Sequence, residues 1–343
     1  MAVTLADVAK RSGVSVATAS RVLNNKMVMP IPPATVERIR RAARELEYRP
    51  NAIARALATG KTHTLGLYSQ EMTDPHFAQM LEAVEAKARA LGFHLIVSST
   101  LDEVSRRGRV DGLLTLGSPT DARFAGLTDR LATVFVYHSS VPQPNLVAWS
   151  DEDGMYLATK HLLELGHRQI VGLLCYGERF PYAKAEGFRK ALAEADTHGI
   201  ECWEAFHADQ LKQGNQFENG YLATQQLLQS GETFTAIVAR NDFLALGALR
   251  ALRAAGIAVP EQVSVVGYTD SVYALCADPP LTSVRTPIAE AGEIAVERLV
   301  RSIEGEEASF PGIMLPTSLT LRQSCAPPSG RAGGSGGETA GPL

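Results

Sequence analysis

The segment Thr4–Asn24 constrains the fold of this chain most, because it predicts two short helices joined by a tight turn. Apolar spacing indicates a first helix over Leu5–Ser12 and a second over Val16–Leu23. Gly13 permits the left-handed backbone that ends a helix, and Ser15 is placed to cap the second helix. A helix-turn-helix of this kind lays its second helix in the major groove of DNA. The alternative is a small helical hairpin with a solvated face.

The distribution of charge favours the DNA-binding interpretation. Residues 1–61 contain 11 Lys and Arg residues against 4 Asp and Glu residues, a net charge of +7. The rest of the chain contains 22 basic and 33 acidic residues, a net charge of −11. A basic end on an acidic body indicates a segment that binds a polyanion.

Two more helices are predicted before Lys61. The stretch Pro33–Leu46 keeps an apolar stripe at helical spacing, and proline suits a first helical turn. We expect it to close the core of a small helical domain, with its arginines mainly on a solvated face. A second helix of about nine residues fits between Asn51 and Gly60, fewer than the roughly 12–15 at which isolated helices become marginally stable. It should therefore be poorly formed alone and fold on DNA.

From Thr62 onward, short apolar runs alternate with helical segments, which predicts parallel sheets covered on both faces. The length suffices for two such sheets. Only Thr100–Arg109 separate the second and third strands, so we expect a crossover helix of a turn or two. The predicted strands are Thr64–Tyr68, Phe93–Ser99, Val110–Leu116, Thr133–Tyr137, Gln169–Leu174, Ala236–Ala239 and Ser264–Gly267.

Several classes of protein are disfavoured. No apolar run approaches 18 residues and no apolar signal core opens the chain, so we expect no membrane partner and a cytoplasmic protein. The cysteines form no CxxC pair and read as reduced packing residues, and we expect no metal and no cofactor. We find no phosphate loop or nucleophile elbow, and hence no catalytic residues and no support for an enzyme. The cysteines are Cys175, Cys202, Cys276 and Cys325.

The chain resembles the lac repressor/galactose repressor (LacI/GalR) family of bacterial transcriptional regulators. The resemblance is carried by TLADVAKRSGVSVATASRVLNN, YRPNAIARALATGKTHTLGL, GHRQI, ARNDFLALGALRAL, VSVVGY and PPLTSVRTP, and it extends from Thr4 to about Arg322. It implies an all-α helix-turn-helix headpiece (residues 1–48) and a hinge helix and linker (49–61). It also implies an α/β effector-binding and dimerisation domain (62–322) of the two-lobed, type I periplasmic-binding-protein kind with parallel sheets.

The resemblance also implies where the lobes divide. The N-lobe would comprise about 62–149 and 287–316, and the C-lobe about 150–286 and 317–322. The tail, residues 323–343, is rich in Pro, Gly and Ser, and we expect it to be disordered. It lacks leucine heptads, so we expect a homodimer rather than a tetramer.

The resemblance assigns residues that contact operator DNA. Arg21 is suited to a bidentate contact with guanine, whereas Val16 and Ala17 offer only apolar contact. In the family a leucine of the hinge helix wedges between the central base pairs, and Leu57 falls at that place, with interdomain packing as the alternative. The expected phosphate contacts are Thr4, Ser15, Thr18, Ser20, Asn24 and Tyr48.

Effector contacts are expected in loops at the carboxyl ends of strands. Asn241 matches a family asparagine that bonds the ligand, and we expect Asp242 to cap the following helix. The candidates are Tyr68, Asp74, Phe77, Trp149, Lys184, Asn241, Thr269 and Asp270.

Some of these candidates have structural alternatives or depart from the family. Asp74 could cap a helix, and Trp149 could pack in a core. Lys184 stands where relatives carry an arginine, and it lacks that residue's bidentate fork. Thr269 stands where many relatives hold an aspartate, while Asp270 reads mainly as structural but could compensate for the missing acid. This chain therefore does not reproduce the family's usual set of sugar contacts.

We accordingly predict a ligand-responsive repressor of sugar uptake or catabolism genes. It would bind a palindromic operator as a dimer and be released by a small effector, a sugar by resemblance. Two alternatives stay open. One is a corepressor-dependent regulator that senses a nucleobase or another metabolite, and the other is a solute-binding module without a role at DNA.

Overall fold

The computed structural model describes residues 3–23, 30–48, 60–70, 72, 75–106, 109–174, 182–201 and 216–329. The chain divides into two compact units. One comprises Met1–Thr64 and Arg106–Asp111, and the other comprises Leu65–Ser105 and Gly112–Leu343. The predicted hinge helix and the candidates Asn24, Leu57 and Asp74 lie outside the described residues.

The first unit contains the predicted helices α1 (Leu5–Ser12), α2 (Val16–Leu23) and α3 (Pro33–Glu45). Gly13 ends α1 with φ 64° and ψ 38°, the left-handed conformation that the sequence predicted. The three helices bury one small apolar core, and this burial stabilises helices too short to persist alone. The core consists of Val8, Ala9, Ala19, Val22, Ile39, Ala42 and Ala43.

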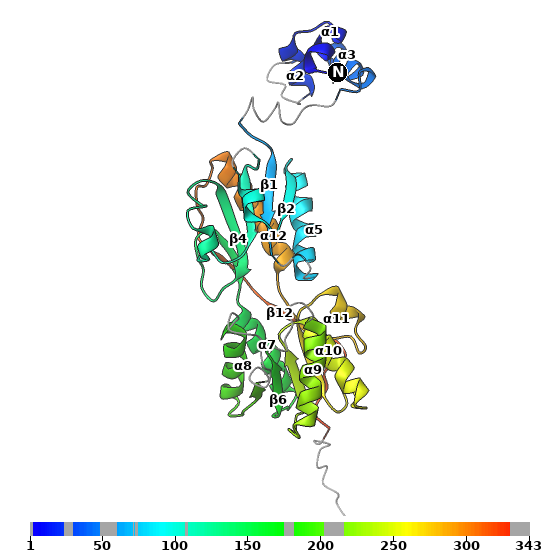
Figure 1. Ribbon diagram of the computed structural model, residues 1–343, viewed down its shortest axis with the longest axis vertical. Coiled ribbons are helices and arrows are strands. Elements are labelled where there is room, and N and C mark those ends of the chain that lie inside the picture. Colours follow the sequence, from blue (N-terminus) through cyan, green and yellow to red (C-terminus); the bar gives the residue numbers. More distant parts are fainter. Residues whose placement is uncertain are drawn as a thin grey trace, which may run out of the picture. The chain divides into compact units, whose positions relative to one another are not determined.

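The second unit contains two six-stranded sheets (Figure 1). We call the first sheet and its helices the N-lobe. Its strand order is β11-β5-β4-β3-β1-β2, and its helices are α5, α6 and α12 with the 3-10 turn η1. The strands are β1 (Thr64–Tyr68), β2 (His94–Ser98), β3 (Gly112–Leu116), β4 (Ala132–His138), β5 (Leu146–Trp149) and β11 (Ile313–Leu315). The other elements are α5 (Pro75–Ala90), α6 (Leu101–Ser105), η1 (Ala122–Phe124) and α12 (Ile288–Glu304).

Helices α5 and α12 pack side by side over one face of the N-lobe sheet and bury most of its core (Figure 1). The crossover between β2 and β3 is the short one expected, because α6 has only five residues. A Cβ atom on Gly66 would lie 2.6 Å from the carbonyl oxygen of Val104, so glycine at this strand position lets α6 approach.

We call the second sheet and its helices the C-lobe. Its strand order is β12-β10-β9-β8-β6-β7. The strands are β6 (Ile170–Leu173), β7 (Ile200–Glu201), β8 (Ala236–Ala239), β9 (Ser264–Thr269), β10 (Thr282–Arg285) and β12 (Ser318–Thr320). The helices are α7 (Asp151–Glu164), α8 (Tyr182–Glu194), α9 (Gln216–Gln229), α10 (Asp242–Ala254) and α11 (Val272–Cys276).

Helices cover both faces of the C-lobe sheet, as the apolar strands predicted. Along β8, Ile237 and Ala239 join the core under α9 and α10, while Ala236 and Val238 join the core under α7 and α8. Among the strand pairings whose register is defined, only that of β10 with β12 is antiparallel, and the others are parallel. The helical first unit and the two α/β lobes with mainly parallel sheets agree with the predicted architecture.

The chain passes between the two sheets at three places. Ser150 joins β5 to α7, Thr286 and Pro287 join β10 to α12, and Pro316 with Thr317 joins β11 to β12. Because these connections lie close to strand ends, polar side chains from both lobes gather near them. Among the described residues, no helix is long and apolar enough to cross a membrane.

The expectation that the tail is disordered from Gln323 is wrong for residues 323–329. Ser324 is fully buried, and its hydroxyl oxygen accepts a hydrogen bond from the Thr282 backbone N–H at 2.8 Å. The backbone N–H of Ala326 donates to the Ser264 hydroxyl at 3.0 Å. Specific polar bonds hold this segment against β9 and β10, and a Pro- and Ser-rich composition does not predict them.

Candidate DNA-contacting helix and effector pocket

Helix α2 presents the three predicted base-reading residues to solvent. Ala19 and Val22 are buried in the core, whereas Val16 is 48% exposed and both Ala17 and Arg21 are exposed. This division follows from helical spacing, since residues on the face opposite the core cannot be buried by α1 or α3. Their assignment to DNA bases stays a prediction.

Ser15 starts α2 in the way the sequence predicted. Its hydroxyl oxygen accepts from the backbone N–H of Thr18 at 3.1 Å, and the two hydroxyls lie 2.8 Å apart. Such a cap satisfies one of the free N–H groups of the first turn. Both side chains reach the surface, and Ser20 is partly exposed further along the helix.

Two other predicted phosphate contacts have structural roles in the headpiece. Thr4 forms a capping box with Asp7, in which the Thr4 backbone N–H donates to the Asp7 carboxylate at 2.9 Å. Tyr48 is partly buried and packs against the headpiece core. Arg38 has a role that the sequence analysis missed, because its Nε donates to the carbonyl of Ser12 at 2.8 Å, at the end of α1.

Three predicted effector contacts are buried in the N-lobe. Tyr68, Phe77 and Trp149 are 3%, 4% and 5% exposed. The Tyr68 hydroxyl accepts from Arg123 Nη1 at 3.2 Å, and Phe77 and Trp149 belong to the core under α5 and α12. Their assignment as effector contacts stays a prediction.

A buried carboxylate collects polar groups where β5 passes into α7. Asp151 is 5% exposed and accepts hydrogen bonds from Trp149 Nε1 at 3.1 Å and from the Tyr268 hydroxyl at 2.9 Å. Lys184 Nζ lies 3.5 Å from its other oxygen, and His138 Nδ1 lies 3.7 Å from it. We call these five residues the junction network. It joins the ends of β4 and β5 in the N-lobe to α7, α8 and β9 in the C-lobe.

The charges in the junction network stabilise one another. Burial raises the pKa of the Asp151 carboxyl, but Lys184, His138 and the hydrogen bonds outweigh it, so the net shift is downward. Burial lowers the pKa of His138, opposed by Asp151 and assisted by Lys184. Burial and the neighbouring carboxylate raise the pKa of Tyr268 well above its usual value. The network therefore includes an ionised carboxylate beside the Lys184 ammonium, and a protonated phenol that donates to the carboxylate.

Lys184, predicted to grip the effector, is held inside this network. Its side chain is 12% exposed, and Nζ lies 3.8 Å from the centre of the Tyr268 ring. Nζ also donates to the carbonyl of Arg240 at 3.3 Å. Its charge is already balanced by Asp151.

The predicted cap of α10 is wrong by one residue. Asn241 is the N-cap, since its Oδ1 accepts from the backbone N–H of Leu244 at 2.9 Å, and its amide donates to Gln216. Asp242 is buried and faces the sheet instead. A Cβ atom on Gly267 would lie 2.4 Å from the Asp242 carboxylate, so only glycine admits the carboxylate here.

Asp242 holds the loop that follows β9. Its carboxylate accepts from the Ser283 hydroxyl at 2.6 Å, from the Ser271 backbone N–H at 2.7 Å and from the Thr269 hydroxyl at 3.1 Å. Burial raises the pKa of Asp242, and these donors oppose that rise. Thr269 has φ 104°, a conformation that costs energy for any residue but glycine, and the three bonds help to sustain it.

Asp270 has the structural role that the sequence favoured. Its carboxylate pairs with Arg322 at 2.6 Å and accepts from the Thr320 hydroxyl at 2.8 Å, which ties the loop to the strand β12 segment. The backbone N–H of Asp270 donates to the Ser283 hydroxyl at 3.1 Å.

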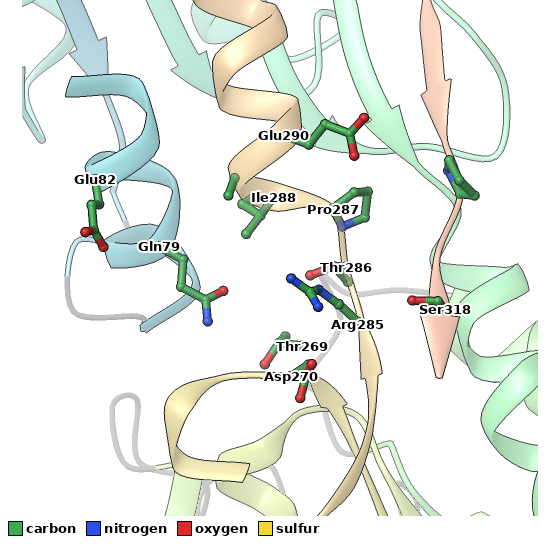
Figure 2. Close-up of a pocket in the computed structure, with 12 residues that line it drawn as sticks. Gln79, Glu82, Thr269, Asp270, Arg285, Thr286, Pro287, Ile288, Glu290 and Ser318 are labelled. Carbon is green, nitrogen blue, oxygen red and sulfur yellow. The ribbon is translucent and has the colours of Figure 1, made fainter. Parts of the chain in front are cut away.

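Residues of both lobes line a pocket of about 540 Å³ at the second and third connections. Of the predicted effector contacts in the described chain, it contains Thr269 and Asp270. Figure 2 shows Gln79, Thr269 and Arg285 arranged around it. The lining residues are Gln79, Glu82, Thr269, Asp270, Arg285, Thr286, Pro287, Ile288, Ala289, Glu290, Pro316 and Ser318.

Sequence reasoning missed Arg285 and Thr286, although a usable signal existed. Arg285 is the last residue of β10, and ligands of open α/β sheets gather at the carboxyl ends of strands. Gln79 could not be found in this way, because it lies on α5 and reaches the pocket only through the packing of the two lobes. The described residues contain no group of His, Cys, Asp and Glu that could hold a metal ion.

Comparisons with known proteins agree with this architecture. Residues 4–51 match the family described as bacterial regulatory proteins, lacI family, and residues 159–325 match the periplasmic binding protein-like domain. The chain is 32% identical to the HTH-type transcriptional repressor PurR of Haemophilus influenzae (strain PittEE), over 94% of this chain and 98% of PurR. It is 30% identical to the HTH-type transcriptional regulator DegA of Bacillus subtilis (strain 168), over 95% and 99%.

Solved structures show the same likeness. The lac repressor dimer bound to operator and the anti-inducer ONPF has a TM-score of 0.79 and 29% identity, covering 95% of this chain and 100% of that one. A complex of the regulator CelR with cellobiose has a TM-score of 0.63 and 30% identity, covering 94% and 99%. A LacI family regulator from Enterococcus faecium with bound ribose has a TM-score of 0.66 and 28% identity, covering 77% and 99%.

The chain therefore belongs to the lacI family of bacterial regulatory proteins, a family of transcriptional regulators. The predicted resemblance is confirmed, and the helix-turn-helix and the two-lobed body are the parts that define the class.

Proposed function

We propose that this protein represses transcription as a homodimer that binds a palindromic operator through α2, and that a small effector between the lobes controls this binding. The observation that carries the proposal is the exposed face of α2, with Val16, Ala17 and Arg21 directed away from the headpiece core. Its site of action would be the chromosome, in the bacterial cytoplasm.

Arg21 would supply most of the base discrimination. A guanidinium can bond two acceptors of guanine in the major groove, which is worth about 1–3 kcal/mol against the wrong base. Val16 and Ala17 would contact thymine methyl groups. Register on the duplex would come from phosphate contacts by Thr4, Ser15, Thr18, Ser20, Asn24 and Tyr48.

Leu57 would open the operator centre from the minor groove, although it lies outside the described residues. Replacing Leu57 with Ala should reduce DNA bending and specific affinity without changing headpiece stability, because the wedge acts only on the bound duplex. Bending can be measured by gel migration of circularly permuted operator fragments. Unchanged bending would assign Leu57 to interdomain packing.

An exposed apolar surface on α11 supports the dimer. Val272, Tyr273 and Leu275 are 60%, 43% and 61% exposed, although all three are large hydrophobic residues close together on one short helix. Apolar clusters of this kind mark interaction surfaces. The lac repressor dimer bound to operator is a structural relative. We therefore propose that α11 contributes to the contact between two copies of this chain.

A sugar is the effector that relatives favour, since CelR binds cellobiose and the Enterococcus faecium regulator binds ribose. A second candidate is a corepressor such as a nucleobase. Two departures from the family pattern favour it. Lys184 and Thr269 stand where the resemblance places an arginine and an aspartate that contact a sugar. Lys184 is also already paired with Asp151.

The decisive experiment compares the full chain with a chain that lacks residues 1–61. Footprinting of the purified full chain at low salt on fragments upstream of its own gene should reveal a protected palindrome. The truncated chain should lose this binding completely and keep its thermal transition. DNA binding that survives the truncation would refute the headpiece assignment.

A further inference from the structure

The effector pocket contains a cation whose charge the surrounding protein does not balance. Lys184 is paired with Asp151 in the junction network, and Arg322 lies 2.6 Å from the Asp270 carboxylate. Within the described ranges of the chain, Arg285 has neither an ion pair nor a hydrogen bond from its guanidinium. Its side chain is exposed, so it is available to a ligand.

The acidic residues of the lining do not take over this role. Asp270 is neutralised by Arg322. Figure 2 shows the Glu290 carboxylate directed away from Arg285, and Glu82 lies one turn further along α5 than Gln79. On the side of the pocket lined by Gln79, a neutral amide rather than a carboxylate faces the Arg285 guanidinium.

The first turn of α12 adds positive potential at the same wall. Ile288, Ala289 and Glu290 line the pocket, and they begin a helix of 17 residues. Its N-cap is Pro287, whose side chain makes no capping hydrogen bond. The N-terminal end of a helix carries a partial positive charge that favours anions. This effect supplements the full charge of Arg285.

We propose that the effector of this protein carries a negatively charged group, a phosphate ester or a carboxylate, and that Arg285 binds it. The proposal rests on the function proposed above and names the class of its ligand. A planar guanidinium can bond two oxygens of either group. Gln79 and the Thr269 hydroxyl, whose proton is donated to Asp242, would bond the polar remainder of the ligand. The volume of about 540 Å³ suits a molecule the size of a charged monosaccharide or nucleoside.

This assignment changes how the cleft selects ligands. Because Lys184 is committed to Asp151, a neutral sugar would find no charged partner on the α8 side of the junction. An anionic ligand would gain a new ion pair at Arg285, on β10, next to the connection into the N-lobe. Binding there would tie the first turn of α12 to the end of a C-lobe strand.

The test uses the full-length protein and simple anions as probes. Thermal unfolding is followed in sodium phosphate and in sodium acetate, with sodium chloride added to hold the ionic strength constant. The wild type should be stabilised by one of these anions beyond chloride. A stronger effect of phosphate indicates a phosphate ester, and a stronger effect of acetate indicates a carboxylate.

Arg285→Gln should lower the apparent affinity for that anion about tenfold, which corresponds to about 1.4 kcal/mol. The matched control is Arg89→Gln, which removes an exposed charge at the other end of α5 and should respond like the wild type. This control is needed because the basic headpiece also attracts anions. The proposal is wrong if neither anion stabilises the wild type, or if Arg285→Gln and the wild type respond alike.

Operator binding without added anion separates this proposal from the proposed function. If the wild type binds no operator but its anion response still depends on Arg285, the repressor function fails and the anion site stands. If operator binding is normal and the anion response is absent, only the anion site fails.

Discussion

Helix α2 of the headpiece and the junction network between the lobes are built in opposite ways. On α2, Val16, Ala17 and Arg21 are near neighbours in sequence, exposed, and positioned by a helix that needs only a small core. In the junction network, Asp151 and Lys184 come from different helices and are almost completely buried. The exposed side chains of α2 can therefore be substituted without unfolding the headpiece. In the junction network, the loss of any one residue leaves its partners buried without their contacts.

This difference separates recognition from stability. A solvated side chain contributes to binding only when its partner arrives, so its removal should cost affinity and little else. A buried ion pair is different, because removing one member leaves the other charged and unsatisfied in a medium of low polarity. Substitutions in the two regions should therefore appear in different measurements.

The largest effect is expected for Asp151→Ala. It would leave the Lys184 ammonium and the donors of Trp149 and Tyr268 without their acceptor, at a cost of about 3–5 kcal/mol in the free energy of unfolding. Urea unfolding monitored by Trp fluorescence measures this loss. Binding of operator DNA by the surviving folded fraction should be unchanged.

The matched control is Asp278→Ala. This carboxylate is 86% exposed and pairs with Arg253 at the surface, a type of bridge worth about 0–1 kcal/mol. Equal losses for Asp151→Ala and Asp278→Ala would show that the junction network contributes no more than a surface pair.

The same contrast explains what could be predicted from the sequence. Helices α1 and α2 were predicted with correct bounds because Gly13 and Ser15 act on their immediate neighbours. The paired roles of Asp151 and Lys184 were not predicted, since no local pattern relates a residue at the start of α7 to one on α8. Their contact depends on how two helices pack.

The strands show a similar limit. Strand β1 has the predicted bounds, because its run of buried residues is preceded and followed by polar ones. The three-residue strands β11 and β12 were missed, since a run so short carries no periodicity. Among the missed pocket residues, Gln79 and Arg285 come from elements that meet only when the lobes are assembled.

A smaller effect is expected for Arg21→Ala, and it should fall on binding alone. Loss of a bidentate base contact should weaken the cognate operator by about 1–3 kcal/mol, or roughly 5- to 150-fold, and affect random DNA much less. Because Arg21 is exposed, the free energy of unfolding should change by less than about 0.5 kcal/mol. Fluorescence anisotropy with both kinds of duplex measures the ratio.

Arg41→Ala is the control within the headpiece. Arg41 is 66% exposed and lies on α3 beside Glu45, so its loss lowers the same net charge without touching α2. It should weaken the operator and random DNA equally. If Arg21→Ala does the same, Arg21 is a phosphate contact and the base-reading assignment is incorrect.

The smallest effect is expected at Asn241, which combines a structural role with a predicted role in ligand binding. Asn241 caps α10 and is also a predicted ligand contact. Asn241→Ala should cost about 1 kcal/mol of stability through loss of the cap, whereas serine is a good N-cap and Asn241→Ser should restore most of it.

Thermal unfolding compares the three proteins. If Asn241 only caps the helix, the serine variant should regain stability, and all three proteins should respond alike to the stabilising anion. If it also binds the effector, the serine variant should regain stability while effector affinity stays low, because the hydroxyl does not reach as far as the amide. A serine variant as unstable as the alanine variant would contradict the capping role, and the bond from Asn241 to Gln216 would then be the contact that matters.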